Sequence, residues 1–357
     1  ELLVEGQPFW DSFFGYHNLQ RFTSVVNDHL QPWWFFGPVM LVAALPFTPF
    51  LLKGLIGAPR SRVEPEQSLQ QFAVCWLLAV LILFTSAATK LPSYWLPATP
   101  ASALLVALAT VRRDRLQTVA WWVSLGLTGL LACGFWAASL WVPLINDPEM
   151  PSLSVDLLAS GYVIQAAIWF SVAAVLGLLA LVLRRTAALG LLAMQAPLLL
   201  FHLTALIPTS ELADRLRQVP VRDAAEKMMQ TRLADEPLAM VGAMKPSLHF
   251  HTGEVILYEG RSDGALVNLA DRLTHEQRRG WRGHPLGSEQ ASETVLLLID
   301  SGTAAQKHWR DLNPTRLGEF GIYELWRLDR SLLESRAKTL MAEGVSADWF
   351  EPRPERF

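Results

Sequence analysis

Six long segments without Asp, Glu, Lys or Arg dominate the first 210 residues of this 357-residue chain. They are Trp33–Leu52, Phe72–Thr89, Leu91–Val111, Leu116–Ile145, Leu157–Leu183 and Thr186–Ser210. Each is about as long as, or longer than, the ~20 residues that an α-helix needs to cross the apolar core of a bilayer. Only 18% of all residues are charged, against about 25% in soluble proteins. We therefore predict an α-helical polytopic membrane protein with six spans.

The chain becomes polar after Ser210 and predicts a mixed α/β domain there. The expected strands are Leu238–Val241, Leu248–Phe250, Val255–Tyr258, Thr294–Ile299 and Gly321–Arg327, and the expected helices are Glu211–Ala234, Leu266–Gln277 and Thr303–Leu312. The predicted organisation is an amphipathic interfacial segment (1–32), a six-helix transmembrane region (33–208), an α/β domain (209–350) and a disordered tail (351–357).

Arginines in the short loops predict the orientation. They follow the first, third and fifth spans, at Arg60, Arg62, Arg112, Arg113, Arg115, Arg184 and Arg185. Loops rich in Lys and Arg stay in the cytoplasm. By parity, we place the first 32 residues, the loop around Lys90, the loop Asn146–Asp156 and the C-terminal domain on the extracytoplasmic side. The expected location is the bacterial inner (plasma) membrane, with multiple passes.

Lys90 is the exception to this charge pattern. Of the nine Lys and Arg residues between Trp33 and Ser210, eight lie in or near the predicted cytoplasmic loops, and Lys90 lies on the other side. It belongs to the sequence TKLPSYWLPATPA, where a lone ammonium group is costly unless an anion accompanies it. The alternative is a lysine whose charged end reaches the outer interface while its stem stays apolar.

Prolines mark two of the predicted spans as irregular. The first span contains Pro38, Pro46 and Pro49, and the third contains Pro92, Pro97 and Pro100. Proline removes a backbone donor and breaks regular helix. Irregular backbone at membrane depth is tolerated only against protein or a polar cavity. We therefore expect these two spans, rather than the fourth and fifth, to form a site.

Polar side chains are dense in the first 32 residues, on the same predicted side as Lys90. The candidate substrate-binding set takes five residues from this segment, His17, Arg21, Asn27, His29 and Gln31, and adds Trp34, Lys90 and Tyr94. Arg21 offers a planar fork for phosphate oxygens and Lys90 a point charge. The alternative is an amphipathic connector with solvated polar groups. His17, Asp28 and His29 could ligate a metal, but their spacing matches no metal motif, so we predict no metal site.

Several motifs together resemble a known family. The strings QRF, NDHLQPWWFF, LPFTPFLL and TKLPSYWLPATPA are similar to those of bacterial integral-membrane glycosyltransferases of the protein mannosyltransferase type, and most similar to the lipid A aminoarabinose transferase branch. The likeness covers roughly Phe13 to Leu108. The string QRF alone is too short to indicate the family, whereas the pattern K-L-P-[ST]-Y-x-L-P after it is fairly specific for the family.

This resemblance implies an enzyme that transfers a sugar, with inversion, from a polyprenyl-phosphate donor to an acceptor outside the cytoplasm, whether lipid, glycan or protein. It also implies a catalytic carboxylate in an early extracytoplasmic loop, which no motif of this chain matches. We therefore expect the chain to be the C-terminal part of a larger protein, with Asp11 and Asp28 as weaker candidates for the base.

Two other functions stay open. A non-catalytic subunit that binds lipid-linked sugar and a flippase are both compatible with broken helices and a buried cation. Besides the donor and the acceptor, the expected partners include the lipids of the membrane. No Walker or dinucleotide-binding motif indicates a cofactor, and a net charge of −3 gives no reason to expect nucleic acid.

Overall fold

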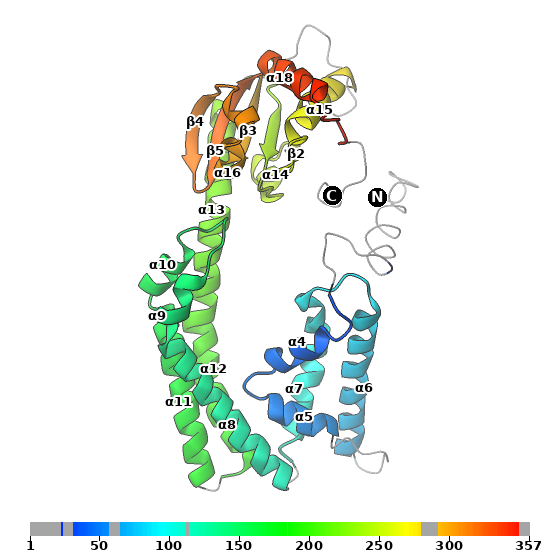
Figure 1. The fold of residues 1–357 in the computed structure, drawn as a ribbon. Helices are drawn as coiled ribbons and strands as arrows, with labels where there is room; N and C mark the ends of the chain where they lie inside the picture. Colours follow the sequence, from blue (N-terminus) through cyan, green and yellow to red (C-terminus); the bar gives the residue numbers. More distant parts are fainter. Residues whose placement is uncertain are drawn as a thin grey trace. The chain divides into compact units, whose positions relative to one another are not determined.

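The computed structural model describes Thr23 and residues 31–56, 65–111, 114–183, 185–279 and 292–349. The chain divides into two compact units (Figure 1). The helical unit holds residues 1–142 and 158–208, and the sheet unit holds residues 143–157 and 209–357. The sheet unit therefore combines the C-terminal part of the chain with a short segment that comes from between two apolar helices.

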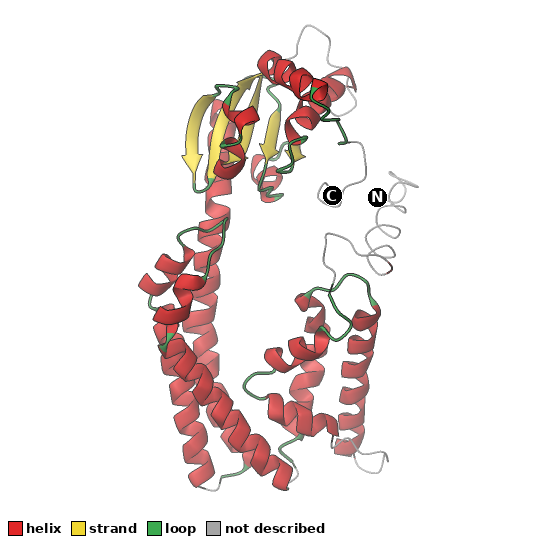
Figure 2. Ribbon diagram, in the orientation of Figure 1, coloured by secondary structure: helices red, strands yellow, loops and turns green. Residues whose placement is uncertain are grey.

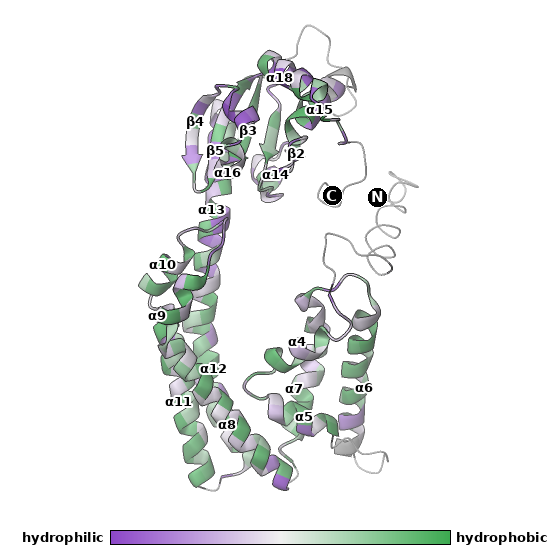
Figure 3. Ribbon diagram, in the orientation of Figure 1, coloured by the Kyte–Doolittle hydropathy of each residue, from purple (hydrophilic) through white to green (hydrophobic). Residues whose placement is uncertain are grey.

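The helical unit is built almost entirely of apolar helices (Figures 2 and 3). Its elements are α4 Phe36–Ala43, α5 Thr48–Ile56, α6 Pro65–Ser86, η2 Pro92–Ala98, α7 Thr99–Leu108, α8 Arg115–Trp136, α9 Ala138–Trp141, α11 Tyr162–Val182, α12 Ala187–Phe201 and the π-helical turn η4 His202–Leu206. Ile82, Leu130 and Val182 are each at least 67% exposed on these helices. Surfaces of this kind require an apolar surrounding.

Within the described ranges, four continuous helices are long and apolar enough to cross a membrane. They are Ser68–Ser86, Arg115–Trp136, Tyr162–Val182 and Ala187–Thr231. A fifth is counted if α4 and α5 form one broken span. The prediction of a polytopic helical protein is thus confirmed, whereas the described helices supply four or five candidate spans and do not confirm the predicted number of six.

The α4–α5 pair shows what the prolines do to the first predicted span. The two helices meet at an angle of 118°. Pro46 lies in the break, where it can neither donate a backbone hydrogen bond nor continue α4. The Thr48 hydroxyl donates to the carbonyl O of Leu41 at 2.6 Å across the bend. The segment Trp33–Leu52 is therefore a bent pair of short helices.

The third predicted span, Leu91–Val111, contains only the short 3₁₀ helix η2 and the ten-residue α7. It is not among the candidate spans because its α-helical part is too short. α7 nevertheless packs closely against α5. A Cβ atom added at Gly54 would lie 2.6 Å from the carbonyl O of Leu105, so only glycine allows the two backbones to approach this far.

In its described residues, the sheet unit contains five strands and several helices, and three of these helices cross its boundaries. The elements are η3 Val142–Leu144, α10 Leu153–Ala159, α13 Ile207–Thr231, β1 Leu238–Val241, α14 Ser247–Thr252, β2 Ile256–Glu259, α15 Ala265–Arg279, β3 Thr294–Asp300, α16 Ser301–Ala304, α17 Lys307–Arg310, β4 Thr315–Phe320, β5 Tyr323–Asp329 and α18 Arg330–Ala342. The predicted mixed α/β fold of this region is confirmed.

The strand order is β2-β1-β3-β5-β4. β1 runs parallel to β2 and β3, whereas β5 runs antiparallel to both β3 and β4. α15 and α18 cover one face, with Leu266, Leu297 and Trp326 in the core between them. α13 and α14 cover the other face, where Met228 and Leu296 are fully buried. The central strands β1 and β3 are therefore almost continuously apolar, as expected for strands covered on both faces.

Two expectations for this unit were wrong, and two of its elements were not predicted. Leu248–Phe250 alternates like a strand but lies in α14, a helix that Gly253 ends with a φ of 66°. β4 was not predicted because it is a polar edge strand, and α18 was not predicted either. The predicted helix Thr303–Leu312 is two short helices, α16 and α17.

Candidate functional site

Lys90 lies between the end of α6 and the start of η2. The residue is 7% exposed, and its Nζ donates a hydrogen bond to the carbonyl O of Ala87 at 2.7 Å. One carbonyl satisfies one of the three N–H donors of an ammonium group. No described Asp or Glu forms an ion pair with Lys90. An anionic ligand would therefore be a favourable partner for this buried charge.

The backbone around Lys90 follows from Pro92. Leu91 is extended, with φ of −118° and ψ of 144°, as the residue before a proline prefers. The η2 helix that follows carries Tyr94, whose ring centroid lies 4.9 Å from that of Phe84 near the end of α6. Lys90 and Tyr94 thus lie at the same end of α6. The next residue, Trp95, is 5% exposed and belongs to the apolar core.

The other predicted site residues are only partly described. Gln31 is half-buried, and Trp34 is 55% exposed. His17, Arg21, Asn27 and His29 lie outside the described residues, as do Asp11 and Asp28. Within the described residues, no group of three or more His, Cys, Asp or Glu could hold a metal ion.

A pocket of about 410 Å³ lies within the helical unit, between the α4–α5 bend, α7 and α12. Its wall is mostly apolar, with Leu45, Phe47 and Val106 among its lining side chains. Ser102 and Gln195 add isolated polar groups. Such a lining suits a hydrocarbon chain that makes few polar contacts.

Three charged side chains from separate segments meet in the sheet unit. Glu149 belongs to the segment 143–157, Arg217 to α13, and Lys245 to the loop after β1. Oε2 of Glu149 accepts hydrogen bonds from Nζ of Lys245 and from Nε of Arg217, both at 2.6 Å. We call these residues the Glu149 cluster. They fasten the segment 143–157 to the carboxyl end of β1 and to α13.

The Glu149 cluster makes the attachment of the segment 143–157 dependent on pH. Burial raises the pKa of Glu149, but the hydrogen bonds from Lys245 and Arg217 outweigh it, so the pKa falls below the ordinary 4.5. A carboxyl group with a lowered folded pKa stabilises the structure above its unfolded pKa, and this contribution is lost as the pH falls through the folded pKa. We therefore expect the protection factors of amides in residues 143–157, which correct for the intrinsic exchange rate at each pH, to fall as the pH drops below 4.5.

The variant Glu149→Gln tests the same contact. Loss of charge-assisted hydrogen bonds worth ~1.5–3 kcal/mol should speed exchange in residues 143–157 by roughly 10- to 150-fold at pH 7 and weaken its acid dependence. The matched control is Glu226→Gln, because Glu226 is exposed on α13 and bonds only to Gln230 among the described contacts. Equal protection of the segment in both variants would contradict the assignment.

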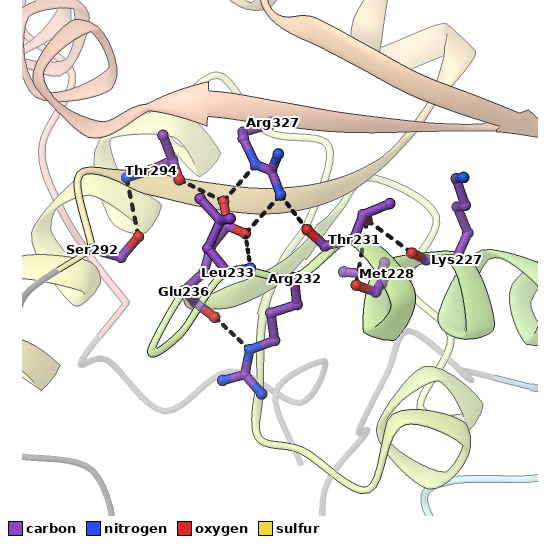
Figure 4. A network of polar contacts seen from close by, with 9 residues as sticks. All are labelled: Lys227, Met228, Thr231, Arg232, Leu233, Glu236, Ser292, Thr294 and Arg327. Carbon is purple, nitrogen blue, oxygen red and sulfur yellow. Dashed lines mark hydrogen bonds and ion pairs between the residues drawn. The ribbon is translucent and has the colours of Figure 1, made fainter.

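A second carboxylate, Glu236, joins α13 to the sheet (Figure 4). Its side chain is fully buried. Oε1 accepts from Nε of Arg327 at 2.9 Å and from the hydroxyl of Thr294 at 2.5 Å, and Oε2 accepts from the backbone N–H of Leu233 at 3.0 Å. Arg327 also donates to the carbonyl O of Thr231 at 2.5 Å. Since both carboxylate oxygens have protein partners, this network is structural.

The sequence did not point to the Glu149 cluster. Its partners are 68 and 96 residues from Glu149. No local pattern links residues so far apart. The one available signal was topology, because the arginine count predicts the same side of the membrane for the loop Asn146–Asp156 and the C-terminal domain.

Comparison with known proteins first defines a class. Residues 231–344 match the family model described as the cyanobacterial RgtA-type glycosyltransferase, C-terminal domain. The match begins at the end of α13 and includes all five strands, so it covers most of the sheet unit. In its helical fold and in this match, the chain is similar to membrane glycosyltransferases.

Solved structures identify a more specific similarity of fold. The fold matches crystal structures of ArnT from Cupriavidus metallidurans, one bound to undecaprenyl phosphate and one in the apo state. Their TM-scores are 0.63 and 0.62 at 21% and 20% sequence identity. Each match covers 92% of this chain and 57% of the other. The chain therefore has an ArnT-like fold.

Curated relatives agree with this likeness. They are undecaprenyl phosphate-alpha-4-amino-4-deoxy-L-arabinose arabinosyl transferases. The relative from Pectobacterium atrosepticum is 29% identical over 319 residues, which are 85% of this chain and 54% of that protein. The relative from Pseudomonas paraeruginosa is 36% identical over 107 residues, which are 30% of this chain and 19% of that protein.

The chain thus spans about half the length of those curated relatives that match most of it. The resemblance recognised in the sequence is confirmed: the chain is similar to membrane glycosyltransferases of the lipid A aminoarabinose transferase type.

Proposed function

We propose that this chain is part of an integral-membrane glycosyltransferase that moves a sugar from a polyprenyl-phosphate donor to an extracytoplasmic acceptor with inversion. The observation that carries the proposal is the buried Lys90 within the string KLPSY. Sugar transfer leaves negative charge on the lipid phosphate, and a fixed cation in a water-poor site stabilises that charge well.

In this proposal Lys90 and Arg21 contact the lipid phosphate, and Tyr94 donates a further hydrogen bond. His17, Asn27, His29, Gln31 and Trp34 line the space for the sugar.

The donor class is supported by three observations. The curated relatives carry undecaprenyl phosphate in their names, and one matching structure was solved with this lipid. The pocket of about 410 Å³ has the apolar lining that a polyprenyl chain needs. The acceptor is a lipid, a glycan or a protein, presented outside the cytoplasm.

We also propose that the protein crosses the inner membrane six times, with the α4–α5 pair as one crossing and the η2–α7 pair as another. The sheet unit then lies on the extracytoplasmic side. The predicted boundaries of the membrane region, 33–208, and of the α/β domain, 209–350, are part of this proposal. The contact between Glu149 and Lys245 supports it, because it joins two segments that the arginine pattern assigns to the same side.

Reconstitution of the complete protein in liposomes with a radiolabelled polyprenyl-phosphate sugar tests the function. A transferase releases free polyprenyl phosphate and moves the label to an acceptor. A flippase moves the intact donor across the bilayer, and a binding subunit retains it without cleavage. Label that stays on the donor in the presence of acceptor extracts would overturn the proposal.

A further inference from the structure

A second pocket, of about 260 Å³, lies within the helical unit where α8 begins, α11 ends and α12 begins. It is more polar than the pocket beside α7. Gln117, Thr118 and Trp121 of α8 line it, together with Arg185 and Thr186 at the start of α12. Neither Lys90 nor Tyr94 contributes to this pocket, so it is separate from the proposed transfer site.

Arg185 supplies a cation to the second pocket. It is exposed, and no Asp or Glu in the described part of the chain forms an ion pair with it. An arginine fork is suited to phosphate oxygens because it presents several N–H donors in one plane. The pocket also lies on the side that the loop arginines predict to be cytoplasmic.

The start of α12 supplies backbone donors beside Arg185. Thr186 is the N-cap, and its hydroxyl accepts from the N–H of Leu189 at 3.3 Å. The other N–H groups of a first helical turn have no partner within the helix. α12 has 15 residues, so its N-terminus carries the partial positive charge that favours anions.

Trp121 provides an independent indication of a ligand. It is 5% exposed, and its indole Nε1 has no hydrogen-bond partner among the described residues. A Cβ atom added at Gly190 would lie 2.5 Å from Cζ2 of Trp121, which places this edge of the ring against the first turn of α12. Nε1 is attached to the ring carbon next to Cζ2, so the unpaired donor lies near the same helix start. A buried donor without an acceptor is unfavourable.

We infer that the second pocket binds the phosphate of an anionic phospholipid from the membrane leaflet it faces. Arg185 and the start of α12 contact the phosphate, and the indole N–H of Trp121 donates to a head-group oxygen directly or through water. A lipid is favoured over free phosphate because Leu183 and Leu189, on either side of the arginine, are 61% and 53% exposed and offer an apolar surface to acyl chains. This site goes beyond the proposed function and does not depend on it.

Native mass spectrometry of the complete protein tests this inference, with phosphatidylglycerol, a neutral diacylglycerol and inorganic phosphate as separate probes. Wild-type protein should retain phosphatidylglycerol. Arg185→Gln should retain it roughly tenfold less, since one charge-assisted contact is lost. Arg185→Lys, which keeps the charge, should retain an intermediate amount.

Arg115→Gln is the matched control, because Arg115 is exposed at the start of α8 but does not line the pocket. It should bind phosphatidylglycerol like the wild type. Equal retention by Arg185→Gln and Arg115→Gln would overturn the site. Binding of inorganic phosphate without phosphatidylglycerol would overturn the lipid assignment, and equal binding of diacylglycerol would show that the phosphate is not recognised.

Discussion

Replacing Lys90 with methionine in the complete protein is expected to slow sugar transfer about 100-fold, as does the loss of one preorganised charge-stabilising donor in other enzymes. Methionine keeps an apolar side chain of similar length at a residue that is 7% exposed. Expression and membrane insertion should therefore remain unchanged. Single-turnover transfer from a polyprenyl-phosphate sugar in proteoliposomes measures the effect.

Lys53 offers a matched control for Lys90. Its side chain is 9% exposed, but it pairs with Asp114 at 3.1 Å and donates to the carbonyl O of Ala109 at 2.9 Å. Lys53→Met should lower stability without slowing transfer per folded molecule. Lys90→Arg should retain part of the activity, because it keeps a cation. Full transfer by Lys90→Met would refute the phosphate-binding role.

The largest expected loss of stability follows from Arg327→Met. The substitution leaves the carboxylate of Glu236 fully buried without its cation. Breaking a buried pair in this way costs about 3–5 kcal/mol. We expect amides of β1 and β3 to exchange faster by a corresponding factor, and the sheet unit to become sensitive to proteolysis. Pulse proteolysis of the complete protein in detergent gives the change in the free energy of unfolding.

Arg316→Met is the control for this prediction. Arg316 pairs with Glu324 at 3.3 Å, but its side chain is 60% exposed. Exposed pairs contribute about 0–1 kcal/mol, so this variant should remain close to wild type. If both arginine variants lost the same stability, burial of Glu236 would not be the cause.

The membrane part of the fold could be predicted where the signal was continuous. α11 and the start of the long helix from Ala187 lie within predicted spans. α6 and α8 overlap theirs, although α6 begins at Pro65, ahead of the predicted Phe72. An uncharged run of this length favours a helix in lipid by itself. The first and third segments are equally free of charge, yet their prolines divide them into short helices. Hydropathy measures length and apolarity and does not detect such interruptions.

In the sheet and around Lys90, too, features that depend on neighbouring residues could be predicted, and contacts between residues far apart in the sequence could not. Lys90 stood out in the sequence because its charge departs from the loop pattern, and the structure buries this residue. Its role in binding phosphate stays a prediction. Glu236 and Arg327 are 91 residues apart, and both look like ordinary surface residues in the sequence. Their pairing depends on the strand order, which places β5 beside β3 and so brings Arg327 to the end of α13.

The edge strand β4 limits how the sheet unit can associate with other chains. Among the described strands, β4 pairs only with β5, and its register shifts between Arg316 and Gly318. Arg316 and Glu319 are exposed along it. A bulge and charged side chains hinder the addition of a further strand. These features of β4 therefore protect the sheet unit against aggregation, in which the edge strands of neighbouring chains at the membrane would pair into one continuous sheet.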